Sequence, residues 1–538
     1  MTIVARLSGS PWSHVHYEIK SWPGTALVST IALLILVLAF VIRAVYLAFF
    51  HPLARFPGPK LWAISRIPWA YHVIKGDVWH SMDDFHHRYG PVIRIAPDEL
   101  SFISPAAWKD IYCARPHLLK DPRSQTPPLN GANSLFTAVG EEHRRIRGAF
   151  VNAFSDKALR EQSRIIEDHS GQFINRLNEE ALGHGWILDI HAFIGSAIFD
   201  MISHLTWGET SQALQQTSAT KSPDWIRRFF LHARFSTLRN CLSRFSPLDH
   251  ILQWIFLRFT ARQRIANTKL TFERIDRRLA AGYSSRGDFM EPILDRISED
   301  QNGASKGTIT KSEVLTNGVA VVIANSQLGT IAVTTAIYLL LSSDPRCLRR
   351  LVDEVRSAGF PTEADIRVAS TQSLPYLNAV INETLRLHHP TPGSLPRISP
   401  DGGIMIDGHL VPRDTVVGVS LFNIHRWAEN FARPLEFHPE RFLSKEDERY
   451  DRTFLNDRLD AFQPFSMGPR NCIGGKVFLA QARVLISRLL WTFDMELAEP
   501  PEVVANWLNQ KAWLVYEPRS LRVKFTPRPD QPKEPLQW

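Results

Sequence analysis

The sequence predicts a mainly α-helical domain with a minor β portion, carried on one N-terminal transmembrane helix. Three observations predict this fold class. An uncharged apolar run occupies residues 25–42, amphipathic helical patterns dominate from about 106 to 351, and short strands with turns follow Pro390. Hydrophobic residues make up 44% of the chain and charged residues 22%, which is typical of a folded globular protein and not of a disordered one.

The apolar run Thr25–Ile42 is long enough to cross a membrane, since as a helix it rises about 27 Å at ~1.5 Å per residue. Apolar residues resume after Arg43, so we expect the helix to continue to about Phe50. The alternative is a cleaved signal peptide, whose apolar core would be shorter and would end at a small-residue cleavage site. We therefore expect a retained anchor over residues 25–50.

Positive charges flank this anchor unequally. Arg6 and Lys20 lie upstream, whereas Arg43, Arg55, Lys60 and Arg66 lie downstream. Because excess positive charge stays on the cytosolic side of a membrane, we expect residues 1–24 to be lumenal and the domain of residues 51–538 to face the cytosol.

The remaining composition excludes several classes of protein. The four cysteines are scattered, without the spacing of a zinc site or a disulfide framework, which agrees with a reducing compartment. The net charge of +8 is spread along the chain, so we expect no nucleic-acid binding; an anionic membrane surface or an acidic partner fits better.

After the anchor, the patterns predict these elements in order: a stiff extended linker over His51–Lys60, a short strand within Pro91–Phe102, amphipathic helices, a long helix over Lys311–Leu341, short strands after Pro390, a last helix over about Cys472–Phe493, and a closing strand over Leu521–Pro527. The long helix is apolar all round, which is typical of a helix buried in a large core. A second transmembrane span is the alternative, although its small and polar residues suit lipid poorly.

The segment Phe465–Gly474 reads FSMGPRNCIG and precedes the last helix. Gly468 permits a tight turn, and Gly474 leaves room for a flat cofactor to pack closely. Cys472 is expected at the start of the helix, where free N–H groups and the helix dipole lower a thiol pKa. Arg470 could pair with a carboxylate, and Phe465 could shield the sulfur.

This string matches the Phe-x-x-Gly-x-Arg-x-Cys-x-Gly signature and resembles the cytochrome P450 family, in particular fungal members of secondary metabolism. The resemblance covers about His51 to Pro527. It implies a cytochrome P450 fold, a heme b cofactor and Cys472 as the axial iron ligand. It also implies monooxygenation of a small hydrophobic substrate, with electrons from an NADPH-cytochrome P450 reductase at the endoplasmic reticulum membrane. A helical scaffold without haem, in which Cys472 is merely buried, is the non-enzymatic alternative.

Further motifs resemble the same family. Glu383 and Arg386 match its Glu-x-x-Arg element, and Arg441 lies in a Pro-Glu-Arg-Phe segment, which implies a structural triad. The resemblance also implies that haem propionates contact three residues: His143, which replaces the usual Trp, Arg147 and Arg397. The substrate would then lie among residues 122–136, the central helix and the loops after Pro390.

The central helix departs from the family pattern. Where the family carries an acid and a Thr that relay protons, this chain has Gln327 and Leu328, and Asn325 replaces a Gly. Three interpretations stay open. Asn325, Ser326 and Gln327 could serve a substitute relay for monooxygenation; the chemistry could be an oxygen-independent isomerisation or dehydration; or the protein could bind haem without turnover.

Overall fold

The computed structural model describes residues 22–125, 128, 130–218, 224–283, 287–298, 307–517 and 519–528. Most of the expected lumenal segment, residues 1–24, therefore lies outside the described residues. The helices are α1 (Trp22–Val45), α2 (Lys60–Ile64), α3 (Ile67–Lys75), α4 (Val78–Tyr89), α5 (Pro105–Tyr112), α6 (Gly140–Phe150), α7 (Asp156–Gly183), α8 (Ile190–Trp207), α9 (Ala213–Gln216), α10 (Asp224–Leu242), α11 (Asp249–Ala280), α12 (Glu291–Leu294), α13 (Lys311–Ser342), α14 (Pro345–Ser357), α15 (Pro375–Leu387), α16 (Leu421–Ile424), α17 (Gly475–Thr492) and α18 (Pro501–Val504).

The strands form a minor part of the molecule, as predicted. They are β1 (Val92–Ala96), β2 (Glu99–Phe102), β3 (Leu119–Lys120), β4 (Ile187–Asp189), β5 (Ile297–Ser298), β6 (Ile309–Thr310), β7 (Arg397–Ile398), β8 (Ile404–Ile406), β9 (His409–Val411), β10 (Val416–Val419), β11 (Phe493–Leu497), β12 (Ala512–Trp513), β13 (Val515–Tyr516) and β14 (Arg522–Pro527). The largest sheet has the order β1-β2-β10-β7-β3, and β11-β14-β4 form a second sheet that contains the predicted closing strand.

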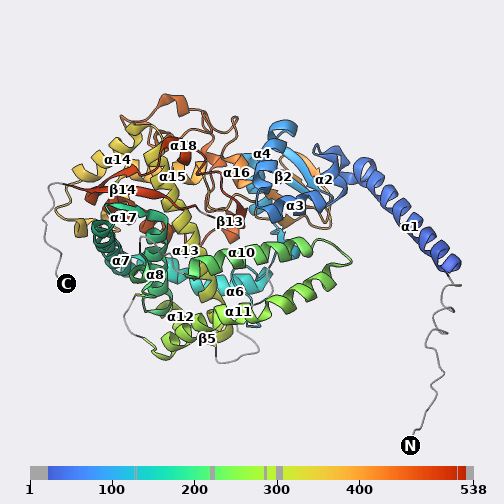
Figure 1. Ribbon diagram of the computed structural model, residues 1–538, viewed down its shortest axis with the longest axis horizontal. Helices are drawn as coiled ribbons and strands as arrows, with labels where there is room; N and C mark the ends of the chain where they lie inside the picture. The colour runs from blue at the N-terminus through green and yellow to red at the C-terminus, as the bar shows by residue number, and fades with distance from the viewer. Residues whose placement is uncertain are drawn as a thin grey trace, which may run out of the picture.

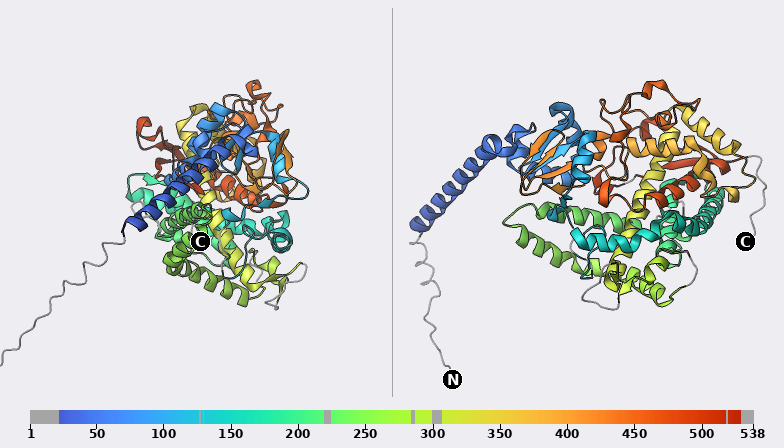
Figure 2. Two further views of the ribbon diagram at one scale, coloured as in Figure 1. Left: turned by 90° about the vertical axis from the view of Figure 1, so that its right-hand side faces the viewer. Right: turned by 180° about the vertical axis from the view of Figure 1, so that it is seen from behind.

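Helix α1 projects from the rounded body of the molecule, and the last described strand, β14, lies on the side away from it (Figures 1 and 2). With the π-helical turn Tyr46–Phe50 that follows, it gives a candidate membrane span over Ala26–Phe50, in agreement with the predicted anchor. The buried Arg94 joins this helix to the domain, because its guanidinium donates to the carbonyl oxygen of Leu47 at 2.7 Å.

Helix α13 crosses the middle of the body and ends within one residue of its predicted limit (Figure 1). It begins with a capping box, in which the Thr310 hydroxyl accepts from the Glu313 N–H and the Glu313 carboxylate accepts from the Thr310 N–H. It packs against α8, α15 and α17, and most of its side chains are buried within the protein. A core position explains its apolar sequence, so the structure gives no support to a second membrane span.

Two local predictions are wrong. The expected strand over Pro91–Phe102 is a pair of antiparallel strands, since Pro97 cannot donate to a sheet ladder and the chain turns there. The linker is not extended throughout: Pro52–Arg55 form a 3-10 helix, because the His51 ring accepts a hydrogen bond from the Leu53 N–H at 3.1 Å.

Candidate active site

Cys472 lies in the loop between a 3-10 turn, Gly468–Arg470, and helix α17. Gly468 has φ +75°, and a Cβ at this position would overlap the carbonyl oxygen of Tyr112, so only glycine fits. The Cys472 N–H donates to the Phe465 carbonyl at 2.8 Å and so closes the loop. A Cβ on Gly474 would meet nothing within 4 Å, which leaves the space beside the thiol open for a flat group.

The predicted lowering of the Cys472 pKa is not found. The thiol lies three residues before α17 begins, not in its first turn. The side chain is accessible from the open space beside it, but the protein that surrounds it still desolvates the thiolate and raises the pKa, and this outweighs the N–H groups of Gly474 and Gly475 and the charge of Arg147, which all lower it. The N–H groups thus stabilise the thiolate as the sequence predicts. The loss of water around the thiolate destabilises it by more, so the net effect on the pKa is upward.

Three arginines approach this loop from different elements. Arg147 on α6 donates to the carbonyl of Asn471 at 2.8 Å and to its side-chain oxygen at 2.6 Å. Arg470 donates from one terminal nitrogen to the Ala138 carbonyl at 2.7 Å, while its other terminal nitrogen is buried without a partner. Arg397 on β7 is buried and donates to the carbonyl oxygens of Leu395 and Pro396.

His143 and Lys120 complete a basic cluster with these arginines. The His143 pKa falls to about 3, chiefly because of burial and then because of Arg470, Lys120, Arg147 and Arg397. Lys120 stands opposite Arg397 in the β3–β7 pair, and burial followed by Arg470 and Arg397 lowers its pKa to about 7. We call Lys120, His143, Arg147, Arg397 and Arg470 the basic cluster.

The basic cluster has the chemistry of an anion site. In the part of the chain that the structure describes, none of its members forms an ion pair with an acidic side chain. Arg397 is buried and Lys120, Arg147 and Arg470 are partly buried, so these four cations repel one another without a counter-ion among the described residues, and a bound dianionic group would offset that cost. The residues therefore fit a haem: a thiol, an open glycine face and cations for two propionates. Sequence reasoning missed Lys120, because a lone lysine in a loop gives no signal until β3 pairs with β7.

Helix α13 is partly accessible on one face along the middle of its length. Ala320, Ala324 and Leu328, spaced four residues apart, are partly accessible, and Ile323 beside them is 38% exposed. Asn325 borders this face, and its side-chain oxygen has no partner. We call these residues the reaction face of α13, because the family resemblance predicts that this helix lines the distal side.

The other two distal candidates are not on the accessible surface. Ser326 and Gln327 are both buried, and neither polar atom of the Gln327 amide has a hydrogen-bond partner. The Ser326 hydroxyl contacts the Ile323 carbonyl at 3.4 Å. Leu328 packs against an apolar cluster that includes Ile331 of the same helix and Phe230 of α10, and this cluster forms an apolar roof at this end of the reaction face.

The predicted triad of Glu383, Arg386 and Arg441 is formed and wholly buried. Arg386 donates to the Glu383 carboxylate at 2.7 and 2.8 Å, and Arg441 donates to it at 3.1 Å. Arg441 also pairs with Asp457. Because both arginines also donate to backbone carbonyls, the triad holds α15 to the chain that leads to the thiol loop.

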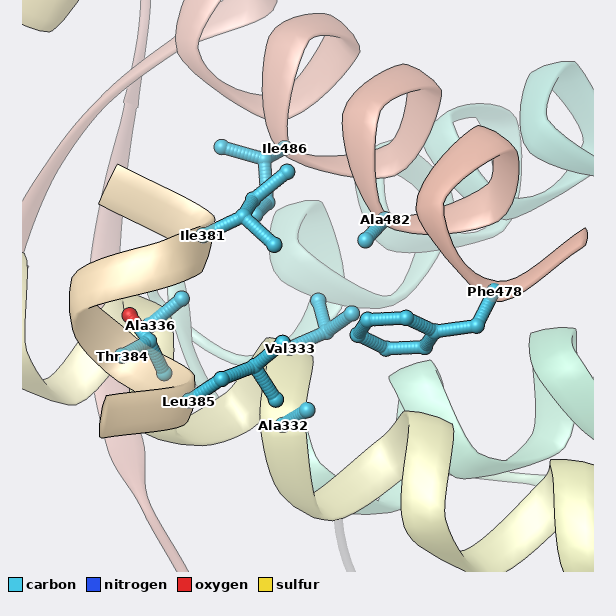
Figure 3. Close-up of a pocket in the computed structure, with 9 residues that line it drawn as sticks. All are labelled: Ala332, Val333, Ala336, Ile381, Thr384, Leu385, Phe478, Ala482 and Ile486. Atoms are coloured by element: carbon cyan, nitrogen blue, oxygen red, sulfur yellow. The ribbon is translucent and has the colours of Figure 1, made fainter. Parts of the chain in front are cut away.

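Helices α13, α15 and α17 meet around a small cavity of about 10 Å³ (Figure 3). Its lining is apolar apart from Thr384, and Phe478 of α17 points across it toward Val333 of α13. The Phe478 ring also lies 6.0 Å from that of Phe465. A cavity of this size takes no substrate, and its lining braces the thiol helix against α13.

Comparison with known proteins agrees with this geometry. The family described as Cytochrome P450 matches residues 56–525. The chain is 36% identical to averantin hydroxylase of Dothistroma septosporum over 92% of this chain and 90% of that protein. It is 35% identical to cytochrome P450 monooxygenase stcF of Emericella nidulans over 91% of this chain and 98% of that protein. It is 33% identical to versicolorin B desaturase of Dothistroma septosporum over 90% of this chain and 90% of that protein. These are names of oxidative enzymes, so the comparisons give no support to the oxygen-independent alternative.

Proposed function

The chain belongs to the cytochrome P450 family, and we propose that Cys472 is the axial ligand of a heme b whose propionates are held by the basic cluster. One observation carries this proposal: five basic side chains from four separate segments gather around the thiol loop without an acidic partner among the described residues. Phe465, Gly468 and Gly474 shape the loop that presents the sulfur.

The protein is a haem-thiolate monooxygenase of the fungal secondary-metabolism type. When bound, the haem supplies oxygen activation, since a thiolate ligand donates electron density that favours O–O cleavage. The protein contributes cations that orient the propionates and an apolar roof over α13 that excludes water.

We propose that Asn325 is the principal polar group on the distal side. It borders the reaction face, and its side-chain oxygen is buried without a hydrogen-bond partner, so it would accept from a water molecule or a substrate hydroxyl that reaches it when the site is filled. Ser326 and Gln327 lie behind it and would act through bound water. Neither amide can deliver a proton as a carboxylic acid does, so the proton would come from water or from the substrate itself.

The substrate is a hydrophobic organic molecule, and we propose a small secondary metabolite. Two relatives are named for averantin and versicolorin B, which supports this class without fixing the compound. The Leu328 and Phe230 roof favours an apolar body, and Asn325 suits an oxygenated position near the site of attack.

The redox partner that the family requires is, we propose, an NADPH-cytochrome P450 reductase. The apolar helix over Ala26–Phe50 supports a single-pass anchor at the endoplasmic reticulum. In this topology residues 1–24 are lumenal, residues 25–50 span the bilayer and residues 51–538 form the cytosolic catalytic domain. The excess of positive charge after the anchor supports the orientation.

The proposal is tested by comparing metabolite masses between a host that expresses the gene and the same host with the gene deleted. We expect a product that is heavier than the accumulated precursor by one oxygen atom. A product of equal mass in the expressing host would overturn monooxygenation of that substrate.

A further inference from the structure

Six charged side chains form an alternating ion network next to strand β3. They come from four segments that are far apart in the sequence: Arg66, Asp98 with Glu99, Asp121 with Arg123, and Arg244 just after α10. Arg66 contacts Asp98 and Glu99 at 2.5 Å each, and Arg123 contacts Asp98 at 2.8 Å. None of these six residues belongs to the family motifs, to the thiol loop or to the basic cluster.

Asp121 is the most deeply buried member, with 0% of its side chain exposed. Its carboxylate lies 2.6 Å from Arg244 and 3.0 Å from the Nε of Arg123, and it accepts the Arg123 backbone N–H at 3.1 Å. The Arg244 contact is an ion pair without hydrogen-bond geometry. Asp121 is therefore held from two sides, by its own 3-10 turn (Pro122–Ser124) and by the chain after α10.

Lys120, the preceding residue, belongs to the basic cluster. It ends strand β3, and the backbone of Asp121 remains extended at φ −63° and ψ 115°. Successive side chains of an extended chain point to opposite sides. Lys120 is thus directed toward Arg397 and Arg470, and Asp121 toward Arg123 and Arg244.

The position of Lys120 is electrostatically unfavourable by itself. Arg397 and Arg470 repel it, and its ammonium group makes one hydrogen bond, to the Phe136 carbonyl at 2.6 Å. A twist of the chain at the end of this two-residue strand would carry the whole Lys120 side chain away from the arginines. The clamped Asp121 on the opposite side of the strand resists that twist.

We propose that Asp121 is a positioning residue for the cofactor: clamped by Arg123 and Arg244, it fixes the end of β3 so that Lys120 stays in the basic cluster and meets a haem propionate. This inference rests on the proposed function, because it assigns Lys120 to the cofactor. It adds a residue that touches neither haem nor substrate and gives the ion network a role in cofactor retention.

A double-mutant cycle on the full-length holoenzyme tests this role. The variants are Lys120→Ala, Asp121→Asn and both together, with Asp98→Asn as the matched control, since Asp98 belongs to the same ion network but is not adjacent to Lys120. The readouts are the rate of haem transfer to excess apomyoglobin and the reduction potential of the haem iron. Thermal unfolding of each variant reports the purely structural effect.

We expect Lys120→Ala and Asp121→Asn each to accelerate haem loss about tenfold, the effect of losing one charged hydrogen bond. Both should lower the reduction potential, because a cation near the haem is removed or displaced. The double variant should match the single ones, since the two residues act in series. Asp98→Asn should lower stability while leaving haem loss and potential unchanged.

Two results would overturn different claims. Additive effects of the two substitutions, or an equal effect of Asp98→Asn on haem loss, would show that Asp121 only stabilises the fold and would refute the positioning role. No effect of Lys120→Ala on haem loss or potential would instead refute the placement of Lys120 at the propionates, and with it that part of the proposed function.

Discussion

The buried triad makes a quantitative prediction for Glu383→Gln. The Glu383 carboxylate accepts hydrogen bonds from Arg386 at 2.7 and 2.8 Å, from Arg441 at 3.1 Å and from the His438 N–H at 2.8 Å. Glutamine has nearly the same shape, but it carries no charge and places an NH₂ group against a guanidinium that can only donate. The substitution therefore leaves two buried cations facing a neutral side chain.

The magnitude follows from the charged hydrogen bonds that glutamine cannot accept. Hydrogen bonds to charged groups contribute about 1.5–3 kcal/mol each, and removing one partner of a buried ion pair costs about 3–5 kcal/mol. Asp457 still pairs with Arg441, which limits the destabilisation. We therefore expect Glu383→Gln to lower the free energy of unfolding by about 3–4 kcal/mol.

The matched control is Glu141→Gln. Glu141 pairs with Arg144 at the same i, i+3 spacing on α6, but its side chain is 82% exposed, so the change should cost less than about 0.5 kcal/mol. Urea unfolding of both variants, followed by circular dichroism, measures the difference. A Glu383→Gln midpoint that matches that of Glu141→Gln would show that burial of the triad carries no stability and would refute the reasoning.

Three further predictions concern the thiol loop, acid stability and the distal side. Gly468→Ala should destabilise the fold by more than about 2 kcal/mol, because residue 468 has a positive φ. Gly474→Ala should leave unfolding of the apoprotein unchanged and should weaken haem retention, because a Cβ there meets no protein atom. Equal haem retention in the wild type and in Gly474→Ala would contradict the packing of a flat group beside residue 474. The pKa of His388 is lowered to about 3, mainly by burial, so between pH 6.5 and 3 the unfolded state binds a proton that the folded state does not. The stability that the neutral, buried His388 contributes is therefore fully present above pH 6.5 and is lost as the pH falls toward 3. His388→Phe should flatten the decline in unfolding midpoint over that range, and an unchanged pH profile would show that His388 is not responsible. Asn325→Leu should lower turnover at least about tenfold. Gln327→Leu should lower turnover less, because Gln327 is buried and would act only through bound water, and it should stabilise the fold by about 1 kcal/mol, because it removes two buried polar atoms without partners. The opposite ranking in steady-state assays would assign the principal role to Gln327.

Patterns that act over short distances were predictable from the sequence. The apolar runs located α1 and α13 to within a few residues, since each is set by its own composition. The string around Cys472 located the thiol loop, because Gly468 is required by a local turn and a close backbone contact. The Glu383 and Arg441 segments were linked by resemblance, and the structure shows them in contact.

Features that depend on distant segments were not predictable. The raised pKa of Cys472 results from desolvation of the thiolate by protein segments that surround it, and the local sequence does not show which segments these are. Lys120 enters the basic cluster only because β3 pairs with β7, which lies far along the chain. The full burial of Gln327 near a half-buried Asn325 depends on how neighbouring elements pack around α13, so nearby residues of one motif have different surroundings.

The most direct test of the account is the difference spectrum of the reduced, carbon monoxide-bound protein for wild type and for Cys472→His. Histidine can still ligate iron, so haem is retained and only the nature of the ligand changes. The account predicts a thiolate-type spectrum for the wild type and an imidazole-type spectrum for Cys472→His at similar haem content. A thiolate-type spectrum that persists in Cys472→His would show that another cysteine holds the iron and would contradict the assignment of the site.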